Sequence, residues 1–230
     1  MSLKIYEDLD QGSSEWLEAR RGIVTASEVG KLVTPTLKIA DNKTSRGLIE
    51  RLAAERISGR IDDHYMSRDM ERGHLDEPFA RQAYEQHMNV EVQQVGFMTR
   101  ELEGFVLGYS PDGLVGETGL IEIKSRKPQL QVMHVLEPDV PHDHMAQMQA
   151  GMLVAGRDWC DYISYSGGLH LKVDRIFADI DWQQQILEAA RRAEFAIRRI
   201  VIDYQTYVEQ AGMPYTEYID HFGDDLELIL

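Results

Sequence analysis

Three charged residues near the middle of the chain have the types and spacing that metal-dependent phosphodiester chemistry needs. Asp112 lies in the turn sequence Ser-Pro-Asp-Gly, and Glu122 and Lys124 follow in the run Gly-Leu-Ile-Glu-Ile-Lys. Alternate side chains of a strand share a face, so a strand here places Glu122 beside Lys124 and turns Ile121 and Ile123 into the core. A hairpin between the turn and this strand would bring both carboxylates together.

This arrangement predicts a magnesium site. Mg²⁺ prefers oxygen ligands in octahedral geometry and keeps several waters, so two carboxylates and a backbone carbonyl suffice. Lys124 could orient or help deprotonate the attacking water, while the metal stabilises the charge that develops on the phosphate. The alternative is a purely structural Glu122–Lys124 ion pair, which is the commoner role of an E-x-K pattern. Chance matches to such patterns are frequent in charged proteins.

A second group of residues, near the N-terminus, could bind a phosphate. Thr25, Ser27 and Glu28 fit a capping box with Thr25 at the N-cap. The first turn of a helix offers backbone N–H groups to an anion, and Arg20 and Arg21 precede this turn. The alternative, that Thr25 and Ser27 only cap the helix, is the commoner case for such residues taken alone.

The elements that must position these residues follow from apolar periodicity and from turn signals. In chain order we expect helices at 13–20, 25–33, 48–57 and 79–84, strands at 90–100, 105–109 and 119–124, a helix at 144–154, strands at 159–165 and 170–179, and a helix at 181–212. This order predicts one α/β domain at 1–212, with a mixed β-sheet flanked by helices on both faces. Residues 213–230 contain five acids and no Lys or Arg, which predicts an acidic C-terminal tail.

The charge distribution bears on the partner. A net charge of −15 over 230 residues argues against nucleic acid. However, residues 16–60 contain nine Lys or Arg and five Asp or Glu, a net charge of +4, which leaves −19 for the rest. A basic front on an acidic body could bind DNA on one face. An acidic surface that serves solubility is the alternative.

Several classes of protein are disfavoured by the composition. The single cysteine, Cys160, excludes an internal disulfide framework, and its place in a predicted strand favours a core residue over a nucleophile. His142 and His144 have a spacing that could bind zinc, but no third ligand is evident. No apolar run is long enough to cross a membrane, and the N-terminus does not have the pattern of a secretory signal. We therefore expect a cytoplasmic protein.

Five motifs extend the pattern beyond the central triad. They are Trp16–Val29, with the form W-x(3)-R-x-G-x-[IV]-T-A-S-E, then Gly73-x(3)-Glu77, Ser110–Gly113, Glu122–Lys124, and a helical Q-x-Q at Gln147–Gln149. In type and order they resemble the motifs of the lambda-exonuclease family (YqaJ-like viral recombinases), a branch of the PD-(D/E)xK nuclease superfamily. The resemblance covers residues 16–149 and implies a restriction-endonuclease-like core.

The resemblance implies a role for each matching residue at the cutting centre. The implied metal ligands are Asp112, Glu122, the backbone carbonyl of Ile123, and Glu77 at a second metal position. Lys124 would be the catalytic lysine. Gln147, rather than Gln149, would hold a metal-bound water or the lysine.

It also implies a group that holds the DNA end. The residues that would contact the 5′-phosphate or the adjoining DNA are Arg20, Ser27, Thr25 and Ser110. Arg126 or Lys127 could supply a further basic contact, and Met70 lies where the family places an apolar wedge.

The activity implied is an ATP-independent, Mg²⁺-dependent 5′→3′ exonuclease on double-stranded DNA ends, with two ions per site and Mn²⁺ able to substitute. It would release 5′-mononucleotides and leave a 3′ single strand for recombination by strand annealing. The family further implies a homotrimeric ring, a single-strand annealing protein as partner, and a phage or prophage origin in a bacterial cell. The alternatives are a structure-specific or restriction-type endonuclease of the same superfamily, or a non-catalytic DNA-end-binding recombination protein.

Overall fold

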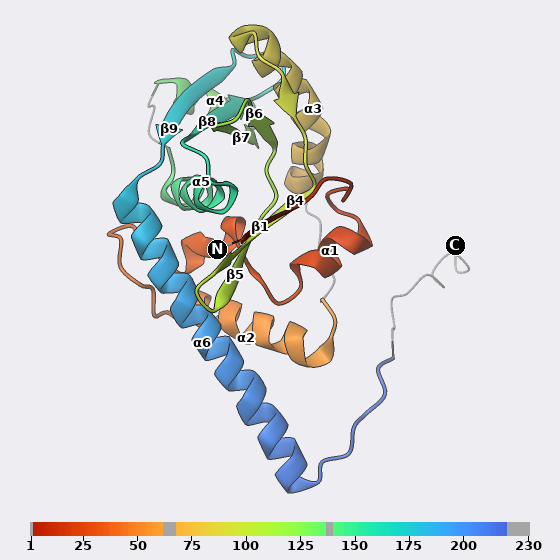
Figure 1. Cartoon of the computed structure of the whole chain (residues 1–230). Helices are drawn as coiled ribbons and strands as arrows, with labels where there is room; N and C mark the ends of the chain where they lie inside the picture. The colour runs from red at the N-terminus through yellow and green to blue at the C-terminus, as the bar shows by residue number, and fades with distance from the viewer. Residues whose placement is uncertain (1, 62–67, 137–139, 220–230) are drawn as a thin grey trace, which may run out of the picture.

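The computed structural model describes residues 2–61, 68–136 and 140–219 (Figure 1). Within these ranges the strands form two sheets. The first has the order β1 (Ser2–Tyr6), β4 (Phe97–Leu102), β5 (Phe105–Tyr109) and β2 (Val24–Thr25). The second has the order β3 (Val92–Gln93), β6 (Gly113–Val115), β7 (Gly119–Ser125), β8 (Trp159–Tyr165) and β9 (Lys172–Phe177). Both sheets are mixed, since β2–β5 and β7–β8 are parallel and the other pairs are antiparallel.

The helices surround these sheets. They are α1 (Ser14–Arg20), the 3₁₀ helix η1 (Ala26–Lys31), α2 (Lys43–Ser58), α3 (Arg68–Met88), α4 (Pro128–Leu136), α5 (His142–Ala155) and α6 (Ile180–Ala211). The α/β class with helices on both faces is confirmed, although the strands are divided between two sheets. No helix in the described ranges is both long and apolar enough to span a membrane.

Strand β7 separates two apolar clusters and so fixes the direction of its side chains. Ile121 and Ile123 pack with Tyr84 of α3 on one face. Leu120 packs with α5 and α6 residues on the other face, where Cys160 is also fully buried. The predicted alternation along this strand is therefore confirmed, and Cys160 is a core residue.

The hairpin between β6 and β7 is also as expected. Gly113 pairs with Ile121 and Val115 pairs with Gly119, so the Ser-Pro-Asp-Gly turn leads directly into the strand that precedes β7. A Cβ at Gly113 would lie 2.1 Å from Cγ1 of Val92. A glycine is therefore needed for β3 and β6 to approach each other closely.

The observed elements differ from the expected ones in several places, and β1 and β6 were not among the expected strands. The single strand expected at 90–100 is two strands, β3 and β4, in different sheets, because the chain crosses from one sheet to the other around Gly96. A Cβ there would lie 1.8 Å from the carbonyl oxygen of Leu9, which shows how closely the two backbone segments meet. The helix α4 follows β7 and has no counterpart among the expected elements.

Helix α6 extends beyond the rest of the molecule at one end (Figure 1). It begins with Asp179 as N-cap and ends at Gly212 in a left-handed conformation. Residues 213–219 form neither helix nor strand, and the ring of Tyr218 lies 3.6 Å from the guanidinium carbon of Arg60. The division into a domain at 1–212 and a tail at 213–230 stays a prediction, and residues 220–230 lie outside the described ranges.

Candidate active site

The central acids and the lysine meet at β7. The Ile123 N–H donates to Oδ2 of Asp112 over 2.6 Å, which ties the turn to the strand. Lys124 Nζ lies 2.6 Å from Oε1 of Glu122 and donates to Oε1 of Gln147 on α5 over 3.2 Å. The side chains of four predicted site residues are thus brought together with the Ile123 backbone, and the Glu122–Lys124 ion pair is part of that group.

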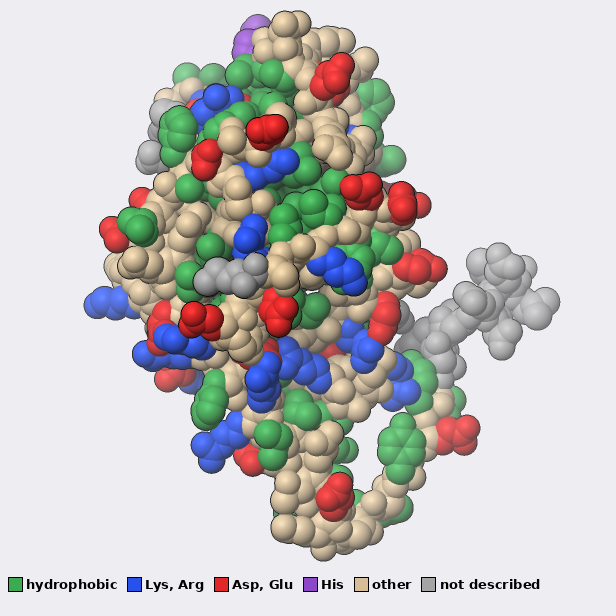
Figure 2. Space-filling view, viewed as in Figure 1, with side chains coloured by type: hydrophobic (Ala, Val, Ile, Leu, Met, Phe, Trp, Pro, Cys, Tyr) green, Lys and Arg blue, Asp and Glu red, His purple; other side chains and the backbone are tan. Residues whose placement is uncertain are grey.

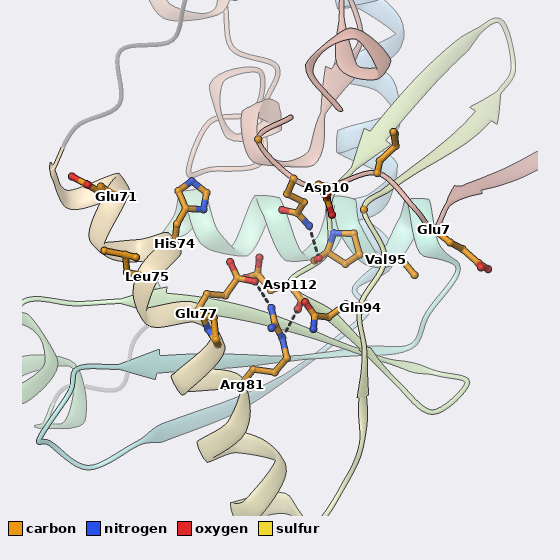
Figure 3. A pocket seen from close by; sticks show the side chains of 16 residues that line it. Glu7, Asp10, Glu71, His74, Leu75, Glu77, Arg81, Gln94, Val95 and Asp112 are labelled. Atoms are coloured by element: carbon orange, nitrogen blue, oxygen red, sulfur yellow. Dashed lines mark hydrogen bonds and ion pairs between the residues drawn. The ribbon is translucent and has the colours of Figure 1, made fainter. Parts of the chain in front are cut away.

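Glu77 reaches the same region from α3. Its Oε1 forms an ion pair with Arg81, one turn further along the helix, and Arg81 Nε donates to the backbone carbonyl of Asp112 over 3.2 Å. Figure 3 shows Arg81 joined to both residues. Sequence reasoning missed Arg81. The helix expected at 79–84 contained Arg81 but not Glu77, whereas α3 includes both residues and makes them i,i+4 neighbours.

The carboxylates are held in an environment that disfavours their ionised forms. Burial, together with repulsion from Asp112, raises the pKa of Glu122 to about 7. Burial and repulsion from Glu77 raise the pKa of Asp112 to about 6, and burial also raises the pKa of Glu77. Burial lowers the pKa of Lys124, but attraction to Glu122 and Asp112 outweighs this effect, so the pKa of Lys124 is raised and the ammonium is stable.

The donor chemistry of this group fits a divalent cation. Glu122 is 1% exposed, and among the described residues its Oε2 has no hydrogen-bond partner. Within those residues no three His, Cys, Asp or Glu side chains are placed to hold a metal by themselves. A cation would therefore take Asp112, Glu122, the Ile123 carbonyl and water, which are ligands that Mg²⁺ accepts.

These shifts predict how stability depends on pH. The folded chain holds the protons of Asp112 and Glu122 more tightly than the unfolded chain does. The contribution of these two protonated carboxyls to folding stability is therefore complete below about pH 4. It is lost as the pH rises through about 6 to about 7. We expect the thermal unfolding midpoint of the metal-free protein to decrease as the pH rises from about 5.5 to about 8. The increase in this midpoint caused by Mn²⁺ should be larger at the higher pH. Differential scanning fluorimetry in EDTA and in Mn²⁺ checks both trends. An equal effect of Mn²⁺ at the two pH values would contradict the assignment.

The phosphate-binding candidates form a second group. Arg20 Nη1 and Trp16 Nε1 both donate to Oγ of Ser110, over 3.0 Å and 2.9 Å. The guanidinium carbon of Arg20 also lies 4.0 Å from the Trp16 ring, and burial lowers the pKa of Arg20 to about 10, so its charge persists at neutral pH. Since Oγ accepts twice, the Ser110 hydroxyl hydrogen is available to a further acceptor.

The predicted capping box at Thr25 is wrong. Thr25 makes no side-chain capping bond, and the segment after it is a six-residue 3₁₀ helix, not an α-helix. The hydroxyls of Thr25 and Ser27 lie 3.2 Å apart, while Glu28 Oε1 pairs with Arg51 at 2.5 Å. Because α2 packs against this segment, Glu28 pairs with Arg51 and does not form the capping bond that was expected of it.

Two adjoining cavities reach part of each group. One, of about 560 Å³, is lined by Asp112, Glu77 and Arg81 (Figure 3). The other, of about 580 Å³, has Arg20, Thr25, Ser27 and Met70 in its wall. Gln11, Gly12 and His74 line both cavities. An extended ligand could therefore reach from Arg20 to Asp112 and Glu77. His74, which lines both cavities, is a candidate that the sequence did not single out.

The remaining candidates have other partners. Arg126 contacts the Tyr162 hydroxyl, and Lys127 pairs with Asp69 at 2.9 Å. His142 Nε2 lies 3.0 Å from the Thr34 carbonyl, whereas His144 contacts Tyr162. The two histidines thus have separate partners. Gln149 is buried and bonds to the backbone at Phe177 and Asp179, away from Lys124.

The fold and the acid–acid–lysine arrangement are those of the PD-(D/E)xK nuclease superfamily. The family model described as the YqaJ-like viral recombinase domain matches residues 15–158. The chain therefore belongs to this lambda-exonuclease-like family. No curated protein matches it.

Solved structures agree with this assignment. The chain is 28% identical to an alkaline exonuclease (LHK-Exo) from Laribacter hongkongensis, with a TM-score of 0.79, covering 86% of this chain and 100% of that one. A structure of LHK-Exo in complex with dAMP is 28% identical, with a TM-score of 0.73, covering 87% and 98%. A phage-related exonuclease from Haemophilus somnus 129PT is 12% identical with a TM-score of 0.59, covering 79% and 96%, and shows the fold alone.

Proposed function

We propose that this chain is an exonuclease of the YqaJ-like recombinase family that digests double-stranded DNA from its ends in the 5′→3′ direction with Mg²⁺. The observation that carries the proposal is the meeting of Asp112, Glu122, Lys124 and Gln147 at the end of β7. A bound Mg²⁺ would polarise the scissile phosphate and lower the pKa of a bound water. Lys124 would hold the attacking water with its ammonium, and Gln147 would orient Lys124.

The proposed polarity depends on the second group. The half-buried guanidinium of Arg20 and the hydroxyl hydrogen of Ser110, which has no acceptor among the described residues, are suited to a terminal phosphate, which carries more negative charge than an internal one. Thr25 and Ser27 add hydroxyls to the wall of the same cavity. A 5′-phosphate held here would place the first linkage near the carboxylates that line the adjoining cavity. The dAMP complex of LHK-Exo, a 28% identical relative, supports nucleotide binding in this fold.

The charge pattern allows one face to meet DNA. Figure 2 shows Lys and Arg side chains over the lower half of one face, where α2 lies, with acidic side chains among them. Such a mixed surface attracts the DNA phosphates only weakly. A homotrimeric ring around the duplex would explain how digestion proceeds despite the net charge of −15, and a single-strand annealing protein would be the partner for the 3′ strand.

The experiment that tests the function compares linear and circular duplexes incubated with Mg²⁺. We expect the linear duplex to yield 5′-mononucleotides and a 3′ single strand without ATP, and the circle to stay intact. Cutting of the circle would favour the endonuclease alternative. Binding of ends without digestion would favour the non-catalytic alternative.

Arg20→Ala is expected to remove the preference for 5′-phosphorylated ends. The half-buried charge that pairs with the terminal phosphate would be lost, at a cost on the order of tenfold to a hundredfold in rate on phosphorylated ends. Rates on 5′-hydroxyl ends would change much less. The measurement is the ratio of initial rates on the two kinds of end.

Arg21→Ala is the matched control, because Arg21 is the next residue along the chain and pairs with the exposed Glu18. This variant should keep the wild-type ratio. If Arg20→Ala also keeps it, the phosphate assignment of Arg20 is wrong.

A further inference from the structure

A chain of hydrogen bonds passes beside the lysine of the proposed site. Arg126 Nη2 contacts the hydroxyl of Tyr162, and His144 Nδ1 lies 2.6 Å from the same hydroxyl. Tyr162 is fully buried and pairs in register with Glu122 across the β7–β8 ladder. The exonuclease chemistry proposed above gives these hydrogen bonds no role.

The direction of each bond follows from the donors available. An arginine can only donate, so the Tyr162 oxygen accepts from Arg126. A buried hydroxyl also needs an acceptor for its own hydrogen, and His144 Nδ1 is the other partner of this hydroxyl among the described residues. Tyr162 therefore donates to Nδ1.

This direction fixes the tautomer of His144. With Nδ1 accepting, the ring hydrogen resides on Nε2. Burial and the nearby charges of Lys124 and Arg126 lower the pKa of His144 to about 4, so the ring is neutral at neutral pH. Burial also raises the pKa of Tyr162, which keeps its hydrogen. Within the described part of the chain, Nε2 of His144 makes no hydrogen bond.

The position of His144 suits contact with an anion. It lies in the first turn of α5, three residues before Gln147, which holds Lys124. The amino-terminal end of a helix carries partial positive charge, and Lys124 and Arg126 are the charges that act most strongly on the ring. The side chain is partly exposed, and Nε2 is its ring nitrogen without a partner among the described residues, so this N–H is the group left for a ligand.

We propose that His144 is a DNA-contact residue that donates its Nε2 hydrogen to a non-bridging phosphate oxygen of the strand being cut. Arg126 and Tyr162 are positioning residues that fix the tautomer which makes this possible. The inference rests on the proposed function, since it takes DNA as the ligand. In this proposal Arg126 acts indirectly, by fixing the tautomer of His144, whether or not it also contacts a phosphate itself.

The test combines protein variants with modified DNA. Duplexes carry one uncharged methylphosphonate linkage, moved step by step from the 5′ end, and their affinities are measured in EDTA by fluorescence anisotropy. At one linkage we expect the wild type to lose affinity on the order of tenfold, because an N–H bond to a charged oxygen is lost. His144→Ala should bind the unmodified duplex more weakly by a similar factor and show no further loss at that linkage.

Two conservative variants separate contact from structure. The amide nitrogen of glutamine can occupy the place of Nε2, whereas that of asparagine occupies the place of Nδ1. His144→Gln should therefore keep the sensitivity at the identified linkage, and His144→Asn should lose it. This pair carries the test even where His144→Ala does not fold. Tyr162→Phe should weaken the sensitivity without removing the ring.

A wild-type sensitivity profile in His144→Asn, or equal profiles for the glutamine and asparagine variants, would overturn the assignment of His144. Failure of the proposed function would give a different experimental result. It would appear as wild-type protein that binds duplex ends but does not digest unmodified linear DNA in Mg²⁺. The affinity profile would still test the contact in that case. A wild-type protein that binds no duplex would overturn both.

Discussion

Lys124→Ala is expected to abolish digestion of linear duplex DNA while leaving end binding within a few-fold of wild type. The Lys124 ammonium lies 2.6 Å from Glu122 and is held by Gln147, so it is the positive charge placed at Glu122. A preorganised positive donor at the reacting centre contributes about 10²- to 10³-fold to a rate, and we expect a loss of at least this size. End binding should persist because the Arg20–Ser110 group is untouched.

Two measurements check this expectation: single-turnover digestion of a 5′-phosphorylated duplex in Mg²⁺, and affinity for the same duplex in EDTA. Lys4→Ala is the control, since Lys4 lies on β1, over the ring of Tyr6. A rate for Lys124→Ala within about tenfold of the Lys4→Ala rate would contradict a role in catalysis. So would digestion that continues in EDTA, because the mechanism needs the metal.

Asp112→Asn is expected to cost as much activity as Lys124→Ala, for a different reason. The amide can still accept the Ile123 N–H through its oxygen, so the turn should remain tied to β7. What is lost is a negative charge among the ligands, and with it most of the affinity for a hard cation. Digestion in Mg²⁺ should fall by about 10²-fold or more.

The same substitution should not destabilise the metal-free protein. Burial and repulsion from Glu77 raise the pKa of Asp112 to about 6, so near pH 8 its ionised form opposes folding. A neutral amide removes that penalty, and the thermal midpoint in EDTA should stay the same or rise. The rise that Mn²⁺ causes in the wild type should be largely absent.

Asp203→Asn, on the exposed surface of α6, is the control and should resemble the wild type in both assays. If Asp112→Asn keeps the full response to Mn²⁺, Asp112 is not a metal ligand. If it instead loses stability in EDTA, its carboxylate has a structural role that the observed hydrogen bond does not explain.

Local features of the active site could be predicted from the sequence. The alternation Ile121-Glu122-Ile123-Lys124 decides which side chains share a face, because neighbouring residues of a strand point to opposite sides. The β6–β7 hairpin follows from the glycine-containing turn and the apolar run after it. Such features depend on residues within a few positions of one another, which is the range over which periodicity carries information.

The long-range contacts of the site could not be predicted in this way. Ser110 accepts from Arg20, 90 residues away, and His144 contacts a tyrosine on the neighbouring strand of β7. The division of the strands into two sheets and the 3₁₀ turn after Thr25 likewise depend on which segments pack together. These outcomes depend on the packing of distant segments and on the hydrogen bonds left to satisfy when groups are buried.

The sequence by itself determined the central acids, the lysine beside them and the strand that presents them, and by its motifs it pointed to the family. Only the tertiary structure decided that Arg81 bridges Glu77 to the Asp112 backbone, and that Asp112 and Arg20 line adjoining cavities. The physical reason is that residue type and spacing set local direction and charge. The distance between two segments is set by the packing of the whole core.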